Sequence, residues 1–378
     1  MQEKIRAFLQ EEAPSTPVLV MDLDVVAARY DKLRQALPEA DIYYAVKANP
    51  VPEVLRLLVE RGAYFDVAST GEIDLCLACG ADATRLSYGN TIKKKSDIAY
   101  AFERGVRLFA YDAPNELEKL AEAAPGADVM CRILTSNEGA DWPLSRKFGC
   151  ELEMAADLLV AAAKLQLHPV GVSFHVGSQQ RNPSQWDPPL AQVAWLFDEL
   201  AAQEVELDTI NLGGGFPAIY RAHVPSISDY GEAIRRSLQR HFSAKERQPR
   251  IIAEPGRYLV ADAGVIAAEV VLVARKAYTE ETRWVFLDIG RFGGLAETEG
   301  EAIAYKITTP HDGGPTGPVV IAGPTCDSVD VMYEHAPYHL PLALEEGDIV
   351  HIHATGAYTS SYSSVAFNGF PPLRTICL

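Results

Sequence analysis

The sequence predicts an α/β protein in which a closed barrel of eight parallel strands is followed by a β domain. Three observations lead to this fold. Short β-rich runs alternate with segments of helical spacing from Ile42 to Gly256, there are eight such strand–helix units, and the rest of the chain loses its helical period. Alternating β and α segments favour parallel strands, and eight units are the number that closes a (β/α)8 TIM-like barrel.

The barrel strands are predicted from runs rich in β-branched and aromatic residues. They are expected at 42–48, 64–69, 85–89, 107–112, 128–134, 170–177, 209–214 and 250–256. Helical segments such as VPEVLRLLVERG lie between them and commonly end in Gly, as a left-handed helix cap requires. The barrel is therefore expected to span residues 22–262.

The remaining chain reads as apolar runs separated by turns. These runs cover 264–278, 283–290, 301–309, 317–323 and 347–358, and Gly and Pro dominate the segment 311–318. This pattern is typical of antiparallel strands. We therefore expect an antiparallel β domain over residues 263–378.

Composition and charge exclude several classes of partner. The chain has 378 residues, 34 Lys and Arg against 51 Asp and Glu, a net charge of −17 and a pI near 5.0. A chain this acidic is not expected to bind nucleic acid or an anionic membrane. The longest apolar run, 264–274, is interrupted by Glu269 and is too short to span a bilayer. The first residues do not form a secretory signal, and six cysteines in a chain of this length favour a reducing, cytoplasmic environment.

Polar residues at the ends of the predicted barrel strands are the first candidates for chemistry, because these ends face the active site in such barrels. Lys47 ends the apolar run YYAVK. It could be a surface lysine, which is the usual fate of Lys, or an amine able to form a Schiff base with a carbonyl. The other strand-end candidates are Asp66, Ser69, Arg132, His175, Ser178, Gly213 to Gly215, Glu254 and Arg257.

The glycine triplet and the AEPGR segment are stronger evidence for a binding site when they are considered together with Lys47. The triplet could be only a tight turn, or its backbone N–H groups could hold a phosphate. Glu254 and Arg257 could be a structural ion pair, or Glu254 could face a pyridinium nitrogen. The second set of interpretations predicts pyridoxal phosphate (PLP) as cofactor, with the flat ring of His175 stacked on it. Alone, His175 would be an ordinary core histidine.

Two other sequence patterns are weak evidence for a functional site. Cys76 and Cys79 form a C-x-x-C inside a helical run without a second pair, and we expect them to be core residues. His351 and His353 would share one face of a strand but lack carboxylates that would complete a metal site. No metal is expected.

Seven ordered motifs cover nearly the whole chain and are similar to those of one family. They are YYAVKANP, FDVASTGEI, SFHVGSQ, NLGGGFP, AEPGRYLV, GPTCDSVD and GAYTSSYSSVAFNGF. The chain resembles the PLP-dependent basic amino acid decarboxylases of fold type III, whose barrel is like that of alanine racemase. GPTCDSVD and FNGF look most like ornithine decarboxylase and the bacterial lysine/ornithine decarboxylases.

The resemblance implies a role for each matched residue. Lys47 would hold PLP, His175 would stack on its ring and Glu254 would pair with the ring nitrogen. A ring kept protonated by Glu254 is a strong electron sink, which favours decarboxylation over racemisation. Asp66, Arg132 and Glu72 would support the lysine and the ring. The phosphate would be held by Gly214, Gly215, Ser178, Arg257 and Tyr358.

The resemblance also implies a homodimer with shared active sites. Cys326 and Asp327 would enter the neighbouring subunit's site, for protonation and for the distal amine of a small cationic substrate, and residues 1–21 would join the β domain. The family's Asn-Asp-Gly is replaced by Asp288-Ile289-Gly290. The second distal-amine aspartate therefore falls on Ile289, with Asp288 displaced by one position and Glu297 further on.

The expected reaction is decarboxylation of ornithine to putrescine, of lysine to cadaverine, or of both. Diaminopimelate or arginine decarboxylation is the alternative within the family. A non-catalytic PLP-binding homologue is the alternative from another class, but such proteins typically lose the lysine or the cysteine, and this chain keeps Lys47 and Cys326.

Overall fold

The computed structural model describes residues 2–142, 146–245, 247–336 and 338–378. The chain divides into two compact units, which we call the barrel unit and the β unit. The barrel unit consists of Ala27–Pro217 and Val224–Gly256, and the β unit of Met1–Val26, Ala218–His223 and Arg257–Leu378. The expected boundaries at 21/22 and 262/263 remain predictions beside these divisions, which fall at 26/27 and 256/257.

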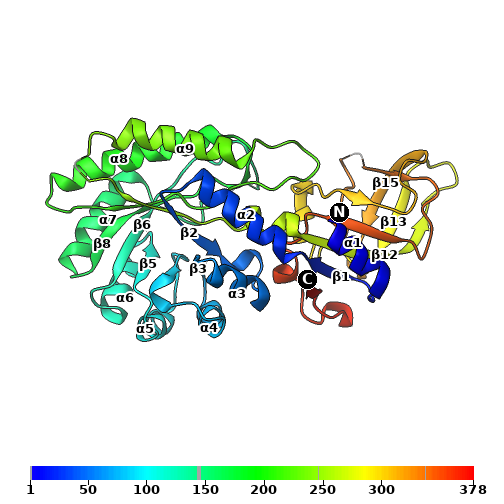
Figure 1. Ribbon diagram of the computed structural model, residues 1–378, viewed down its shortest axis with the longest axis horizontal. Helices are drawn as coiled ribbons and strands as arrows, with labels where there is room; N and C mark the ends of the chain where they lie inside the picture. The colour runs from blue at the N-terminus through cyan, green and yellow to red at the C-terminus, as the bar shows by residue number, and fades with distance from the viewer. Residues whose placement is uncertain (1, 143–145, 246, 337) are drawn as a thin grey trace. The chain divides into compact units, whose positions relative to one another are not determined.

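The barrel unit contains the predicted closed barrel of eight parallel strands (Figure 1). Its strands are β2 (Ala40–Ala45), β3 (Tyr64–Val67), β4 (Leu86–Tyr88), β5 (Leu108–Tyr111), β6 (Asp128–Arg132), β8 (His168–Ser173), β10 (Thr209–Asn211) and β11 (Arg250–Ala253). They pair in chain order, and β11 closes the barrel by pairing in parallel with β2. The short strands β7 (Ala140–Trp142) and β9 (Ser178–Gln180) form a separate antiparallel pair that the sequence did not predict.

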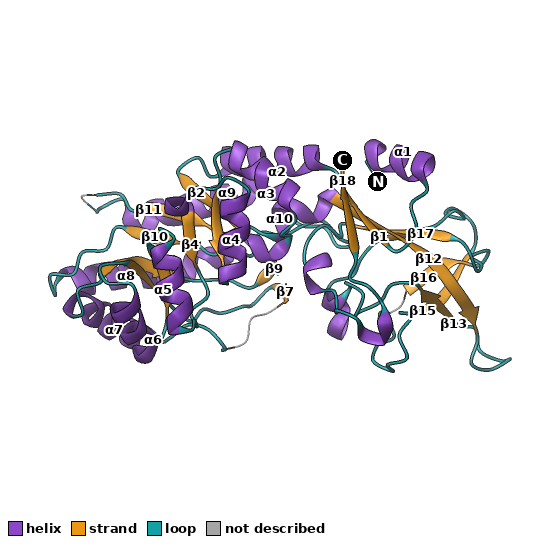
Figure 2. Ribbon diagram, turned by 90° about the horizontal axis from the view of Figure 1, so that it is seen from below, coloured by secondary structure: helices purple, strands orange, loops and turns teal. Residues whose placement is uncertain are grey.

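Helices surround the barrel strands, as Figure 2 shows. They are α2 (Leu23–Ala36), α3 (Pro52–Glu60), α4 (Thr70–Ala78), α5 (Lys95–Glu103), α6 (Pro114–Ala123), α7 (Leu152–Lys164), α8 (Asp187–Ala201) and α9 (Ile227–Phe242). Gly62, Gly80 and Gly105 follow α3, α4 and α5 with positive φ angles of 76°, 94° and 98°. These glycines are the left-handed caps expected from the sequence.

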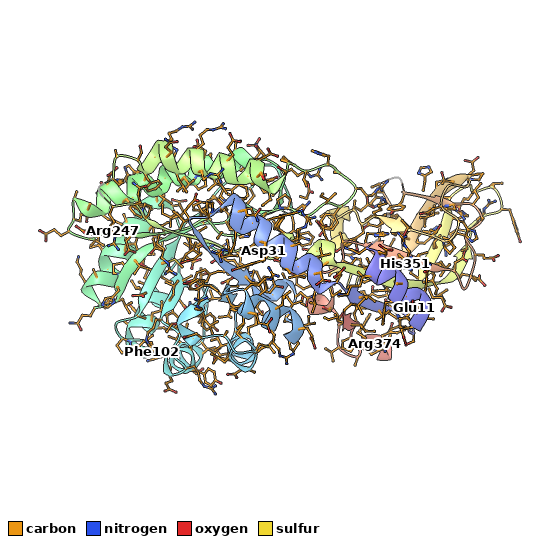
Figure 3. All side chains as sticks on the ribbon, in the orientation of Figure 1. Glu11, Asp31, Phe102, Arg247, His351 and Arg374 are labelled. Carbon is orange, nitrogen blue, oxygen red and sulfur yellow. The ribbon has the colours of Figure 1, made fainter. Side chains whose placement is uncertain are left out.

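Part of the barrel unit's core is filled by apolar side chains from the strands. Tyr43, Leu108, Met130 and Ile252, from four different strands, form one buried cluster, and the Tyr43 and Tyr64 rings stack 4.7 Å apart. Phe102 and Arg247, by contrast, lie at the periphery of this unit (Figure 3). Because sites in such barrels form at the carboxyl ends of the strands, the polar residues there are the candidates for a site.

The β unit is built on one sheet of eight strands. They are β1 (Val18–Met21), β12 (Gly264–Ala274), β13 (Arg283–Leu287), β14 (Ile307–Thr308), β15 (Thr316–Ala322), β16 (Tyr338–Pro341), β17 (Ile349–His353) and β18 (Arg374–Cys377). The order is β14-β17-β12-β13-β15-β16, and β1 pairs with both β12 and β18. Ile5 of α1 (Glu3–Glu12) packs with Val18, Val20 and Val265, so the N-terminal segment covers part of the sheet. Glu11 of α1 and His351 of β17 both lie in this unit (Figure 3).

The β unit is a mixed sheet, which corrects the expectation of an antiparallel domain. β13 pairs with β15 in parallel, and β1 pairs with β18 in parallel. A parallel pair cannot be joined by a tight hairpin. The connection from β13 to β15 accordingly runs through the 3-10 segment η5 (Ala296–Glu301) and the two-residue strand β14, where a longer strand over 301–309 was expected. No helix within the described ranges has the length and apolar character needed to cross a membrane.

Candidate active site

Lys47 lies at the mouth of the barrel. Strand β2 ends at Ala45, and Lys47 follows on a 3-10 turn, Val46–Ala48. Its side chain is 51% exposed, and Nζ lies 3.1 Å from Oδ2 of Asp66. The lysine is thus half open to solvent while it is paired with a buried carboxylate, an arrangement unlike that of a lysine on the protein surface.

Asp66, at the end of β3, is buried and only partly satisfied. Its side chain is 5% exposed, and Oδ1 has no hydrogen-bond partner among the described residues. A Cβ atom at Gly89 would lie 2.0 Å from this oxygen, so only glycine leaves room for the carboxylate. Behind it, Oε2 of Glu72 accepts a hydrogen bond from the backbone N–H of Ala68 (2.7 Å). Burial raises the pKa of Glu72, and the neighbouring Asp66 charge adds to the effect.

Glu254 directly follows β11, and Asn211 fixes its orientation. Nδ2 of Asn211 donates to Oε1 of Glu254 (2.5 Å), and the backbone N–H of Glu254 donates to the carbonyl of Gly213 (2.9 Å). Burial raises the pKa of Glu254 to about 7, and Asp66 adds to the rise, although Asn211, Lys47 and Arg132 act in the opposite direction. A carboxyl group with this pKa can hold or release a proton near neutral pH.

His175 and Arg132 complete the cluster. The backbone N–H of Gly177 donates to Nδ1 of His175 (3.0 Å), so the ring proton is on Nε2. Burial holds the pKa of His175 well below its usual value, and the positive charges of Arg132 and Lys47 lower it further. The imidazole is therefore neutral. Burial also lowers the pKa of Arg132, whose guanidinium lies 5.3 Å from the Phe148 ring centre.

The glycine triplet packs against the neighbouring strand ends. A Cβ at Gly213 would lie 2.0 Å from the Phe174 carbonyl oxygen. A Cβ at Gly214 would lie 2.6 Å from the Glu254 carbonyl oxygen and 3.1 Å from Nε2 of His175. A Cβ at Gly215 would lie 2.5 Å from the Gly177 carbonyl oxygen. This packing alone requires glycine at all three positions. No helix begins at the triplet, since α9 starts only at Ile227 behind its own Ser226 cap, so any anion contact here uses backbone N–H groups without a helix end.

Asn211 is the residue of this cluster that sequence reasoning missed. Besides holding Glu254, its Oδ1 accepts from the backbone N–H of Gly213 (2.9 Å), so one side chain joins the carboxylate to the glycine triplet. The signal was present, because Asn211 is the polar residue at the carboxyl end of β10 within NLGGG. The glycines that follow it in this motif were selected as candidates, and Asn211 was not.

Arg257 and Tyr358 meet in the β unit, at a buried ion pair that was not expected. Two guanidinium nitrogens of Arg257 donate to the Glu297 carboxylate (2.7 and 2.6 Å), and one of them also donates to the Tyr220 hydroxyl (2.7 Å). Burial alone would lower the pKa of Arg257, but Tyr220 and Glu297 outweigh it and raise that pKa. Tyr358, whose ring lies 4.9 Å from the guanidinium carbon, has a φ of +54°, a conformation rare for an aromatic residue.

The remaining candidates lie on separate segments. Cys326 is exposed on the loop after β15, and beside it Oδ1 of Asp327 accepts from the N–H of Val329 (3.0 Å). Asp288, after β13, accepts from the N–H of Glu269 (2.9 Å) and lines a cavity of about 300 Å³ with Thr16 and Phe292. Burial raises the pKa of Asp288. Ile289 is fully buried, and Ser178 begins β9 in the barrel unit.

The barrel cluster fits pyridoxal phosphate. The half-exposed Lys47 side chain offers an amine for its aldehyde, the partly buried Glu254 a carboxyl group for its ring nitrogen, and the neutral His175 a flat surface for its ring face. Oδ1 of Asp66, which has no hydrogen-bond partner among the described residues, is a buried polar atom at the same strand ends that a ligand can satisfy. Residues 23–261 match the family description "Pyridoxal-dependent decarboxylase, pyridoxal binding domain".

The chain belongs to the pyridoxal-dependent decarboxylase family. Its cofactor is pyridoxal phosphate. The matched residues cover the barrel together with the AEPGR segment, so the family assignment rests on the part of the chain that holds Lys47, His175 and Glu254.

Characterised decarboxylases are similar over the full length. A lysine/ornithine decarboxylase of Selenomonas ruminantium is 35% identical over 100% of this chain and 93% of its own length. The structure of a lysine/ornithine decarboxylase from Vibrio vulnificus complexed with cadaverine is 34% identical, has a TM-score of 0.88, and covers 99% of this chain and 97% of its own. An arginine decarboxylase from Paramecium bursaria Chlorella virus is 26% identical, with a TM-score of 0.90 and full coverage of both chains.

Proposed function

We propose that this decarboxylase acts on a basic L-amino acid, ornithine or lysine, and releases CO₂ with putrescine or cadaverine. The observation that carries the proposal is Glu254, a partly buried carboxyl group at the mouth of the barrel that Asn211 orients and whose negative charge is favoured by the positive charge of Lys47. When bound, pyridoxal phosphate supplies an aldehyde and a ring that accepts the electron pair left by CO₂. The residues of the chain bind, orient and exchange protons around it.

Lys47 is the residue that we propose to carry the cofactor. Its half-exposed side chain can be reached by a ligand from solvent, and Asp66 at 3.1 Å provides a carboxylate that can hold the ammonium form whenever the amine is not attached to the cofactor. The neutral ring of His175 offers a flat face without a charge that would repel a protonated ring. Gly214, Gly215 and Ser178 are the proposed phosphate contacts in the barrel unit.

Glu254 is proposed to share a proton with the ring nitrogen. Because burial keeps its pKa near 7, the carboxyl group can retain a proton until a basic nitrogen is beside it, and then form a charge-assisted hydrogen bond. Asn211 keeps the carboxyl oriented for this contact. Glu254, which the fold holds in place, would thereby keep the ring able to accept the electron pair.

Arg257 is a further proposed phosphate contact, and it is already paired with Glu297. Both of its terminal nitrogens already donate to Glu297. A phosphate contact would therefore share the guanidinium with that carboxylate, and the backbone N–H groups of the glycine triplet would carry more of the anion binding. Tyr358 is the further phosphate contact proposed beside Arg257.

Substrate selection is proposed for Asp327, and protonation for Cys326. The negative charge of Asp327 attracts the distal ammonium of ornithine or lysine, which places the α-carbon at a fixed distance. Asp288 is a second candidate, although its carboxylate already accepts from the backbone of Glu269. Glu297 is less suited, since it neutralises Arg257.

We further propose a homodimer with shared active sites and a cytoplasmic location. The loop of Cys326 and Asp327 is exposed, and Val329, Val365 and Phe370 on this loop and the C-terminal segment are 53%, 82% and 41% exposed. Exposed apolar side chains beside an exposed thiol favour coverage by a second copy. The six cysteines, all within the described ranges, form no disulfide, as a reducing compartment favours.

A substrate panel tests the proposed function. Release of CO₂ from L-ornithine, L-lysine, L-arginine and meso-diaminopimelate is measured with the PLP-loaded protein, with Lys47→Ala as the inactive control. We expect ornithine and lysine to be the best substrates. Preference for arginine would move the assignment to the agmatine-forming branch, and no release from any of the four would support a non-catalytic PLP-binding protein.

A further inference from the structure

The loop Gly323–Asp330 carries Cys326 and Asp327, yet it contains no regular secondary structure. An exposed side chain on an irregular loop samples many positions unless the backbone beside it is fixed. A proton donor needs a defined position relative to the carbon that it protonates. The hydrogen bonds around this loop therefore bear directly on what Cys326 can do.

Asp330 fixes the loop next to Cys326. Its side chain is buried, Oδ2 accepts from the backbone N–H of Thr325 (3.2 Å) and from Oγ1 of Thr325 (2.7 Å), and Oδ1 accepts from the N–H of Arg291 (2.8 Å). Cβ atoms at Gly290 and Gly323 would lie 2.2 and 2.3 Å from the carboxylate oxygens. Two glycines thus keep space for this carboxylate.

Asn368 fixes Cys326 itself. Oδ1 of Asn368 accepts from the backbone N–H of Cys326 at 2.9 Å. Asn368 belongs to the FNGF motif, to which the proposed reaction assigns no role, and has a φ of +51° on the turn Phe367–Gly369. Asparagine is one of the few residues other than glycine that adopt this conformation readily.

The two contacts belong to one connected set. Phe367, beside Asn368, packs its ring 4.7 Å from that of Phe292, and Phe292 follows Arg291, whose N–H binds Asp330. Segments around positions 291, 326 and 368 are therefore joined pairwise. A change at Asn368 would release the N–H of Cys326 while Asp330 still holds Thr325.

We propose that Asn368 is a positioning residue that holds Cys326 so that its thiol protonates the substrate carbon from one face. This inference rests on the proposed function, because it requires Cys326 to be the proton donor. The Cα–carboxylate bond breaks, its electron pair remains available at Cα, and the S–H bond breaks as its proton forms the new C–H bond. The thiolate then takes a proton from water. A fixed donor delivers every proton to the same face and gives one configuration.

Two substitutions separate the hydrogen bond from the backbone conformation. Asn368→Gly removes the acceptor, and glycine adopts φ near +51° without strain. Asn368→Asp retains an acceptor oxygen and tolerates the same conformation. Because residue 368 is exposed, neither variant is expected to disturb folding.

The reaction is run in D₂O with the PLP-loaded proteins, and the configuration of the deuterated carbon of the diamine is determined by NMR after chiral derivatisation. We expect one configuration from the wild type and from Asn368→Asp. Asn368→Gly should give both configurations and a kcat lower by roughly tenfold, with KM little changed. Amide hydrogen exchange of the peptide containing residues 323–330 in the cofactor-free proteins should be faster in Asn368→Gly only.

A wild-type rate, configuration and exchange in Asn368→Gly would overturn the inference. Cys326→Ala, measured in parallel, identifies the cause: if it scrambles the configuration while Asn368→Gly does not, Cys326 is the donor and Asn368 does not position it. If Cys326→Ala also leaves rate and configuration unchanged, another group protonates the carbon and the inference fails with that role. A wild type that releases no CO₂ would overturn the proposed function and this inference together.

Discussion

At the scale of single residues, burial and the charge of Asp66 disfavour the negative charge of Glu254. Its pKa of about 7 in the folded protein lies above the value of 4.5 for an exposed glutamate. Below pH 4.5 both the folded and the unfolded chain hold the proton. As the pH rises from 4.5 to 7, the unfolded chain gives up the proton first, so the contribution of this group to stability is lost across that window.

Glu254→Gln removes this titration and keeps the shape of the side chain. The cofactor-free wild type should therefore lose on the order of 3 kcal/mol of unfolding free energy relative to Glu254→Gln between pH 4.5 and 7.5. Unfolding in urea at several pH values measures it, and taking the difference between the two proteins cancels the other titrating groups. Parallel pH profiles would contradict a raised pKa at Glu254.

The covalent attachment of the cofactor is a second prediction at this scale. Reduction of the PLP-loaded protein with borohydride followed by peptide mapping should place the label on Lys47, whose side chain is half exposed beside Asp66. Lys93 is the matched comparison, because its side chain is fully buried against Glu116 (3.1 Å) and should stay unlabelled. A label on Lys93 or any other lysine refutes the assignment.

Sequence reasoning found the strand-end residues for a physical reason that also explains what it missed. Lys47, His175 and Glu254 are polar side chains in runs that are otherwise apolar, so their positions stand out along the chain. Asn211 stands out less beside three glycines. The partner of Arg257 could not be found in this way, because Glu297 lies 40 residues away and only the tertiary fold brings the two together.

At the scale of elements, local sequence patterns predict the barrel strands better than the strands of the β unit. The eight barrel strands each pair with neighbours in chain order, so local pattern plus closure was enough to predict them. In the β unit, β1 pairs with β18 and β13 with β15, and such long-range parallel pairings leave no local trace. The short strand β16, which ends in Pro341, was missed because its four residues do not form a distinct apolar run.

The Arg257–Glu297 pair joins helix α10 (Arg257–Val260) to segment η5 and gives a prediction for these elements. Both side chains are almost fully buried, at 2% and 3% exposure. Arg257→Met or Glu297→Leu alone leaves an unpaired buried charge and should lower the unfolding free energy of the cofactor-free protein by about 3–5 kcal/mol. The double variant should be destabilised less than either single variant.

Chemical unfolding of the four proteins completes this double-mutant cycle. The exposed pair Arg236–Glu232 on α9 is the control, where Glu232→Ala should cost about 1 kcal/mol or less. Additive losses in the Arg257–Glu297 cycle would show that the two residues do not stabilise each other.

At the scale of the whole molecule, the proposed catalytic set is divided between the two units. Lys47, His175 and Glu254 belong to the barrel unit, whereas Cys326 and Asp327 belong to the β unit. A two-fold dimer would bring the β-unit residues of one chain to the barrel of the other and form two identical sites. The alternative is that each chain completes its own site.

Mixing two inactive variants distinguishes these arrangements. Lys47→Ala and Asp327→Ala proteins, each nearly inactive alone, are combined under conditions that allow subunit exchange. If sites are shared, half of the randomly paired dimers are mixed and each has one intact site, so about a quarter of the wild-type activity should return. If each chain completes its own site, no intact site forms and the activity stays at background. Exchange is verified with two differently tagged chains, because a dimer that never exchanges would give the same background activity.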